Sequence, residues 1–145
     1  YLCYNMNKEG YRMGTVPNYL VKTRVSSTSI TAQQKYECYE STYIIKRDII
    51  EPLFTKGNIY IWGAGSFGAL VYDILQKYSY KIKGFVDSDT SKHGQILSGL
   101  PVYSPRILQN KTDVGIIVAS QPGRLSIVNE LEKMGYEHLK NYIVY

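Results

Sequence analysis

The stretch 63–68, with the letters GAGSFG, is the part of the sequence whose residue types and spacing point most directly to chemistry. Gly63 allows a tight turn from strand to helix, Gly65 lets the backbone approach a ligand closely, and Gly68 lets the helix pack against the strand. The N–H groups of a helix start, with its positive dipole end, favour a bound pyrophosphate. We therefore predict that Gly63, Gly65, Ser66, Phe67 and Gly68 hold phosphate groups.

A carboxylate stands where a sugar-binding acid is expected. Asp87 lies 19 residues beyond Gly68, at the end of the next predicted strand, where the acid of a dinucleotide-binding fold accepts hydrogen bonds from ribose hydroxyls. An acid there disfavours a 2′-phosphate, so NAD is expected over NADP. Ser88 is predicted as a neighbouring contact. Asp87 is also a residue type that is common in turns and helix caps, and Asp89 fits either role.

Other polar residues are open to two readings. Ser120 follows the apolar run 114–119, at the sheet edge where ligands bind in such folds, and it serves equally well as the cap of the next helix. Lys92 and His93 follow Asp87 in a loop, where exposure to solvent is favoured over contact with a phosphate or sugar. His138 is interpreted as structural.

No catalytic constellation emerges from the sequence. Two histidines and two cysteines provide no Ser/His/Asp arrangement and no metal cluster, and no helix carries a Tyr-xxx-Lys proton relay. Cys3 and Cys38 have no metal-ligand spacing, and two reduced thiols are favoured over a disulfide. The catalytic residues are unknown, no metal site is expected, and the chain is interpreted as a binding module.

The elements that must position these residues alternate between strand and helix from residue 58 onward. The alternation predicts right-handed βαβ crossovers and a three-layer, Rossmann-like parallel sheet of four to five strands. Residues 88–99 are expected to be a loop. The predicted strands are 58–62, 83–86, 100–103, 114–119 and 142–145, and the predicted helices are 66–78, 104–108 and 124–134.

The preceding residues show a weaker pattern. They suggest a strand at 19–25, a polar break at 26–31 and a helix at 32–50 that Pro52 limits. Tyrosines along one stripe of that helix are interpreted as packing. We therefore divide the chain into an N-terminal hairpin and helix segment, 1–57, and a nucleotide-binding domain, 58–145.

Length and composition narrow the function classes. The 145 residues are enough for one ordinary domain, and a first residue other than Met suggests a fragment of a longer protein. The net charge of +5 is mild and shows no dense basic patch, so no nucleic-acid partner is expected. No run of about 18 apolar residues is present to span a membrane. We expect a cytoplasmic protein.

Five segments in order carry a resemblance to a known family: 62–68 (WGAGSFG), 84–89 (GFVDSD), Lys92 with Gly94, 99–105 (GLPVYSP) with Leu108, and 113–120 (DVGIIVAS). Together they resemble small Rossmann-type nucleotide-binding domains of bacterial sugar and polysaccharide biosynthesis. Similar domains occur in sugar N-acetyltransferases, in nucleotide-sugar dehydratases, and at the C-terminus of sugar C-methyltransferases that use S-adenosylmethionine. The resemblance covers about 63 of the 145 residues.

The resemblance implies a domain that binds NAD or a nucleotide-sugar and serves a transferase or oxidoreductase. No acetyltransferase repeats or dehydratase domain follow it, whereas a methyltransferase domain would lie upstream, with residues 1–30 as its last hairpin. The expected partners are a small-molecule nucleotide and either a second copy of the chain or a fused catalytic domain. The alternative is a structural or oligomerisation module that has lost its ligand. A free-standing dehydrogenase is disfavoured because the chain lacks a proton donor and a second domain.

Overall fold

The computed structural model describes residue 9 and residues 35–145, of which Lys46–Tyr145 form one compact unit. The predicted strand at 19–25, the polar break at 26–31, the hairpin at 1–30 and Cys3 lie outside the described residues. The helix expected at 32–50 is represented by α3, Lys35–Ile50. A 3-10 turn, η1 (Glu51–Thr55), follows with Pro52 in its first turn, where the missing N–H of proline costs nothing.

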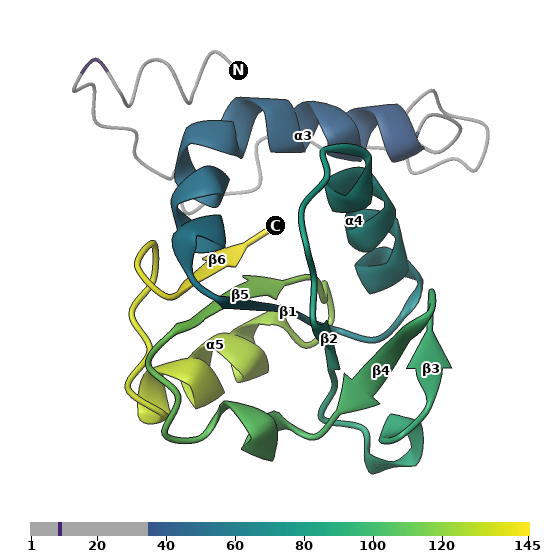
Figure 1. The fold of residues 1–145 in the computed structure, drawn as a ribbon, viewed down its shortest axis with the longest axis vertical. Coiled ribbons are helices and arrows are strands. Elements are labelled where there is room, and N and C mark those ends of the chain that lie inside the picture. The colour runs from purple at the N-terminus through teal and green to yellow at the C-terminus, as the bar shows by residue number, and fades with distance from the viewer. Residues whose placement is uncertain (1–8, 10–34) are drawn as a thin grey trace, which may run out of the picture. The chain divides into compact units, whose positions relative to one another are not determined.

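The unit is built on a six-stranded sheet in the order β3-β4-β2-β1-β5-β6 (Figure 1). All neighbouring strands are parallel except β3 and β4. The mixed α/β architecture and the mostly parallel sheet agree with the Rossmann-like prediction. The strands are β1 (Asn58–Trp62), β2 (Gly84–Val86), β3 (Ile96–Leu97), β4 (Leu100–Tyr103), β5 (Val114–Val118) and β6 (Tyr142–Val144).

The strand count differs from the predicted four to five because residues 88–99 are not wholly a loop. They contain the 3-10 turn η2 (Thr90–Lys92) and the two-residue strand β3, which pairs antiparallel with β4. Ser98 and Gly99 join the two strands with φ of 50° and 80°, the left-handed pair that a two-residue hairpin turn requires. So short a strand carries too few residues for a visible alternation of polar and apolar side chains.

Two helices cover opposite faces of the sheet (Figure 1). α4 (Ser66–Lys77) places Tyr72 edge-on against Phe85 of β2, with ring centroids 5.8 Å apart. α5 (Arg124–Lys133) packs Ile127 and Leu131 into a cluster with Trp62 and other residues of the opposite face. The 3-10 turn η3 (Pro105–Leu108) also contributes to this cluster. Ser104 caps the start of η3, as predicted.

The strand order creates a topological switch point at β1. After β1 the chain continues through α4 to β2 on one side, and after β4 it crosses to β5 on the other side. The connection after β1 therefore runs to β2 on one side, and the connection after β5 runs to β6 on the other side. Such a divergence opens a crevice at the carboxyl ends of β1 and β5. No described helix is both long enough and apolar enough to cross a membrane.

Candidate functional site at the switch point

The glycine turn after β1 is held by close backbone packing. Gly63 has φ of +128°, and its N–H donates to the Val86 carbonyl over 2.8 Å. A Cβ at Gly63 would collide with the backbone carbonyl of Ala119, and a Cβ at Gly68 would collide with the carbonyl of Gly63. Both positions are therefore required for strand, turn and helix to approach one another, which is a structural role.

Gly65 differs from its two neighbours in the motif. It is exposed, its φ of −126° is open to any residue, and a Cβ built on it would meet no atom within 4 Å. Nothing within the described residues thus demands glycine here. No side chain caps the helix that Gly65 opens, and the first N–H groups of an α-helix have no partner within it. Open space in front of such N–H groups is what an approaching phosphate needs.

Phe67 and Ser66 lie in the first turn of α4. Ser66 is exposed, whereas Phe67 is half-buried and packs edge-on against Tyr145, with ring centroids 6.3 Å apart. The Phe67 side chain therefore anchors the helix start to the residue that follows β6. Any contact of Phe67 with a phosphate would come from its backbone.

The carboxylate of Asp87 accepts hydrogen bonds from three groups at the crevice. One carboxylate oxygen, Oδ2, accepts from Ala64 N at 2.8 Å and from Lys92 Nζ at 2.9 Å, and the other accepts from Asp89 N at 2.9 Å. The His93 ring contacts the Asp87 carbonyl oxygen at 2.8 Å. Asp87 thus ties the glycine turn to the loop after β2, and Lys92 and His93 fold back onto it.

The surroundings of Asp87 favour its charged form. Partial burial acts to raise the pKa of Asp87, but hydrogen bonds from Asp89 N, Lys92 and Ala64 N, with the Lys92 charge, outweigh it and leave the pKa below its ordinary value. Asp89 has a different role, because its Oδ1 accepts from Ser91 N and Ser91 Oγ and caps η2.

Because the folded pKa of Asp87 is depressed, its stabilisation is present above the unfolded pKa of about 3.9 and is lost as pH falls through the folded pKa. We expect Asp87→Asn to cost about 1–2 kcal/mol at pH 7, since a partly buried, charge-assisted hydrogen-bond network is weakened. The difference should shrink below about pH 4. Urea denaturation of the wild type and of Asp87→Asn at pH 7, 5 and 3 measures this difference in the free energy of unfolding. Lys92→Gln and the double variant isolate the ion pair, and a difference that stays constant with pH would contradict this role.

Several predicted residues meet in one small cleft at the switch point. Gly63, Asp87, Ser88 and Ser120 all line it, and its volume is about 150 Å³. Ser120 Oγ accepts from Gly123 N at 3.2 Å, in the turn before α5. The interpretation of Ser120 as the cap of this helix is wrong, because the N-cap of α5 is Gly123 and no side chain caps it. The remaining lining residues, none of which was predicted as a site residue, are Trp62, Gly123, Ser126 and Ile127.

Trp62 is the most informative of the residues that the pattern missed. Its side chain is fully buried, and its indole nitrogen Nε1 has no hydrogen-bond partner among the described residues. The sequence shows it as the last residue of an apolar strand, which indicates burial but not an unpaired N–H.

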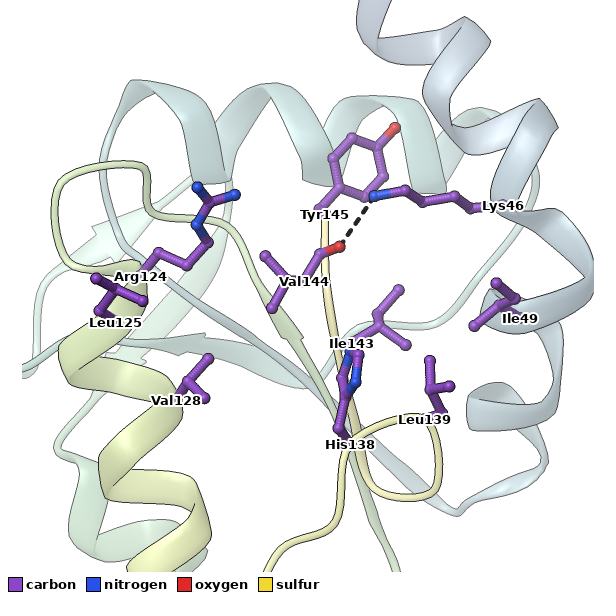
Figure 2. A pocket seen from close by; sticks show the side chains of 10 residues that line it. All are labelled: Lys46, Ile49, Arg124, Leu125, Val128, His138, Leu139, Ile143, Val144 and Tyr145. Carbon is purple, nitrogen blue, oxygen red and sulfur yellow. Dashed lines mark hydrogen bonds between the residues drawn. The ribbon is translucent and has the colours of Figure 1, made fainter. Parts of the chain in front are cut away.

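A larger cavity, of about 430 Å³, lies beside the edge strand β6 and contains none of the predicted site residues (Figure 2). Leu125 and Leu139 line it and are 78% and 56% exposed. Lys46 Nζ donates to the Val144 carbonyl at 3.1 Å, and burial together with the nearby Arg124 charge lowers the pKa of Lys46. His138, interpreted as structural, is exposed and stacks at a tilt on Tyr142.

The described residues contain no group of three or more His, Cys, Asp or Glu side chains placed to hold a metal ion. Cys38 is an exposed free thiol.

Comparison with known proteins gives a similarity to a solved structure and a match to a family. The structure is the UDP-D-quinovosamine 4-dehydrogenase from Vibrio fischeri, with 26% identity over 57% of this chain and 75% of that chain, and a TM-score of 0.46. No curated protein matches the chain. The family model described as "C2185-like, N-terminal" matches residues 55–142, which include the glycine turn, Asp87 and Ser120. The chain therefore belongs to the C2185-like family, through the N-terminal domain of that family.

Proposed function

We propose that residues 58–145 are a nucleotide-binding domain that takes NAD or a nucleotide-sugar at the switch point, within an enzyme of sugar or surface-polysaccharide biosynthesis. The observation that carries this is the contrast within the glycine motif. Gly63 and Gly68 are needed for packing, whereas Gly65 stands in open space at an uncapped helix start. A phosphate bound close to the backbone explains a glycine at position 65, which the packing of the protein does not require.

The other candidate residues support the same placement. Asp87, Ser88 and Ser120 line one cleft beside the glycine turn, although they come from different strand ends. In the proposed complex, Gly65, Ser66 and Phe67 donate backbone N–H groups to phosphate, and Asp87 accepts from a ribose hydroxyl. Oδ2 of Asp87 already accepts two hydrogen bonds, whereas Oδ1 accepts one and retains acceptor capacity for a ribose hydroxyl.

The size of the cleft favours a site that is completed from outside this domain. Small-molecule sites usually enclose about 300–1,000 Å³, roughly two or more times the 150 Å³ found here. We propose that a fused catalytic domain or a second copy of the chain covers the rest of the ligand. The sequence resemblance suggests a transferase or an oxidoreductase. One such parent enzyme is a sugar methyltransferase that uses S-adenosylmethionine, in which the helix before residue 55 links the two domains.

A structural or oligomerisation module is the second candidate. It is favoured by the exposed Leu125 and Leu139 at the β6 cavity, and by the fact that Asp87 already has partners within the protein. Sedimentation that depends on protein concentration and not on nucleotide would support it.

A thermal-shift panel with NAD, NADP, UDP-sugars, coenzyme A and S-adenosylmethionine tests the primary proposal. A ligand at 100 times its dissociation constant adds about 2.7 kcal/mol, which raises the melting temperature by several degrees. We expect NAD or a UDP-sugar to give this shift and NADP to give less, because Asp87 repels a 2′-phosphate. A flat panel from folded protein would contradict nucleotide binding and favour the structural module.

A further inference from the structure

One of the residues that line the switch-point cleft, Trp62, carries a buried hydrogen-bond donor without a partner among the described residues. Trp62 is 0% exposed, its Nε1 exposes less than 1 Å², and no acceptor among the described residues reaches it. Buried polar groups are nearly always hydrogen-bonded, and an orphaned one costs stability. Trp62 is also one of the residues that line the cleft.

The cleft lining indicates what kind of acceptor that is. Three serines, Ser88, Ser120 and Ser126, contribute hydroxyl groups, and Asp87 contributes a carboxylate. The negative charge of Asp87 disfavours a phosphate inside the cleft, whereas sugar hydroxyls donate to a carboxylate and accept from an indole N–H or a serine. The small volume fits one ring and not a dinucleotide.

We infer that Trp62 is a ligand-binding residue whose indole N–H donates to a hydroxyl oxygen of the sugar ring in a bound nucleotide. This inference rests on the proposed nucleotide site and adds to it the group that occupies the cleft. Because Nε1 is covered, binding involves a shift of a neighbouring side chain. Ser88 and Ser126 are exposed residues of the same lining.

The sequence makes this inference unusually easy to test, because Trp62 is the only tryptophan. The ¹⁵N-labelled chain has one indole N–H signal, which needs no assignment by mutation. We expect that signal to move downfield on titration with NAD or UDP-glucose, and to saturate at the dissociation constant that calorimetry gives for the same ligand. Movement with AMP or UMP identifies the ribose as the source of the hydroxyl, and movement with UDP-glucose alone identifies the hexose.

Trp62→Phe provides the matched variant, since it keeps an aromatic ring and removes the N–H. We expect about tenfold weaker binding, the loss of one hydrogen bond. Calorimetric binding with an unmoved indole signal and unchanged Trp62→Phe affinity would overturn this inference and leave the proposed function standing. An equal signal with inorganic phosphate, or with a 2′,3′-dideoxynucleotide, would overturn the sugar contact. Absence of all nucleotide binding would overturn both proposals.

Discussion

Gly68→Ala is expected to lower the free energy of unfolding by about 2–4 kcal/mol and the melting temperature by about 10 °C or more. In most helices this substitution would stabilise by up to about 1 kcal/mol. Here the added Cβ collides with the backbone carbonyl of Gly63, which cannot rotate away as a side chain can. The clash therefore outweighs the gain in helix propensity, so the substitution is destabilising. To relieve the clash, α4 must move away from the turn after β1.

Gly65→Ala is the control for that prediction, because the same chemical change is made three residues away in open space. Its cost as a helix-cap substitution and its gain from a less flexible unfolded chain are each about 1 kcal/mol or less and oppose each other. Urea denaturation of both variants measures the contrast. Equal stability of the two variants would show that the close approach of Gly68 to Gly63 is not a constraint on the fold.

The variant with little effect on stability, Gly65→Ala, is expected to have a large effect on nucleotide affinity. We expect Gly65→Ala to weaken binding of NAD or a UDP-sugar by about ten- to a hundredfold, because the methyl group occupies space that a phosphate needs and removes one or more charge-assisted hydrogen bonds. Since the stability of this variant stays near that of the wild type, the loss reports on the site and not on folding. Isothermal titration calorimetry measures it.

Two outcomes bear on this second prediction differently. Unchanged affinity in Gly65→Ala would place the ligand away from the helix start and contradict the phosphate role of Ser66 and Phe67. Lost affinity together with lost stability would show that Gly65 is a folding requirement, against the open space around it.

The fold could be predicted from residue 58 onward because its signals are local and strong. The run at β5 is apolar throughout, as expected for a strand buried on both faces, and the helical spacing of α4 and the stop at Gly135 match the structure within about a residue. The strand order was not predictable from such signals. It depends on which strands pair across the sheet, and the short β3 carried no pattern of its own.

The candidate site could be predicted only in part. The glycine spacing and Asp87 identified the turn and the acid, but not the ion pair of Asp87 with Lys92, which arises from a five-residue loop that folds back. The contributions of Trp62 and Ser126 to the cleft depend on the packing of α5 against the sheet. A periodic pattern identifies such residues as buried or exposed and says nothing of the partners they lack.

The central claim is that a nucleotide binds at the start of α4, and an NMR titration of the labelled chain with NAD and UDP-glucose tests it most directly. The account predicts that the backbone amide signals of Gly65, Ser66 and Phe67 shift together and saturate with one ligand. Those of Leu125 and Leu139 at the β6 cavity should stay in place. Shifts confined to the β6 cavity, or no saturable shift at the helix start with either nucleotide, would contradict it.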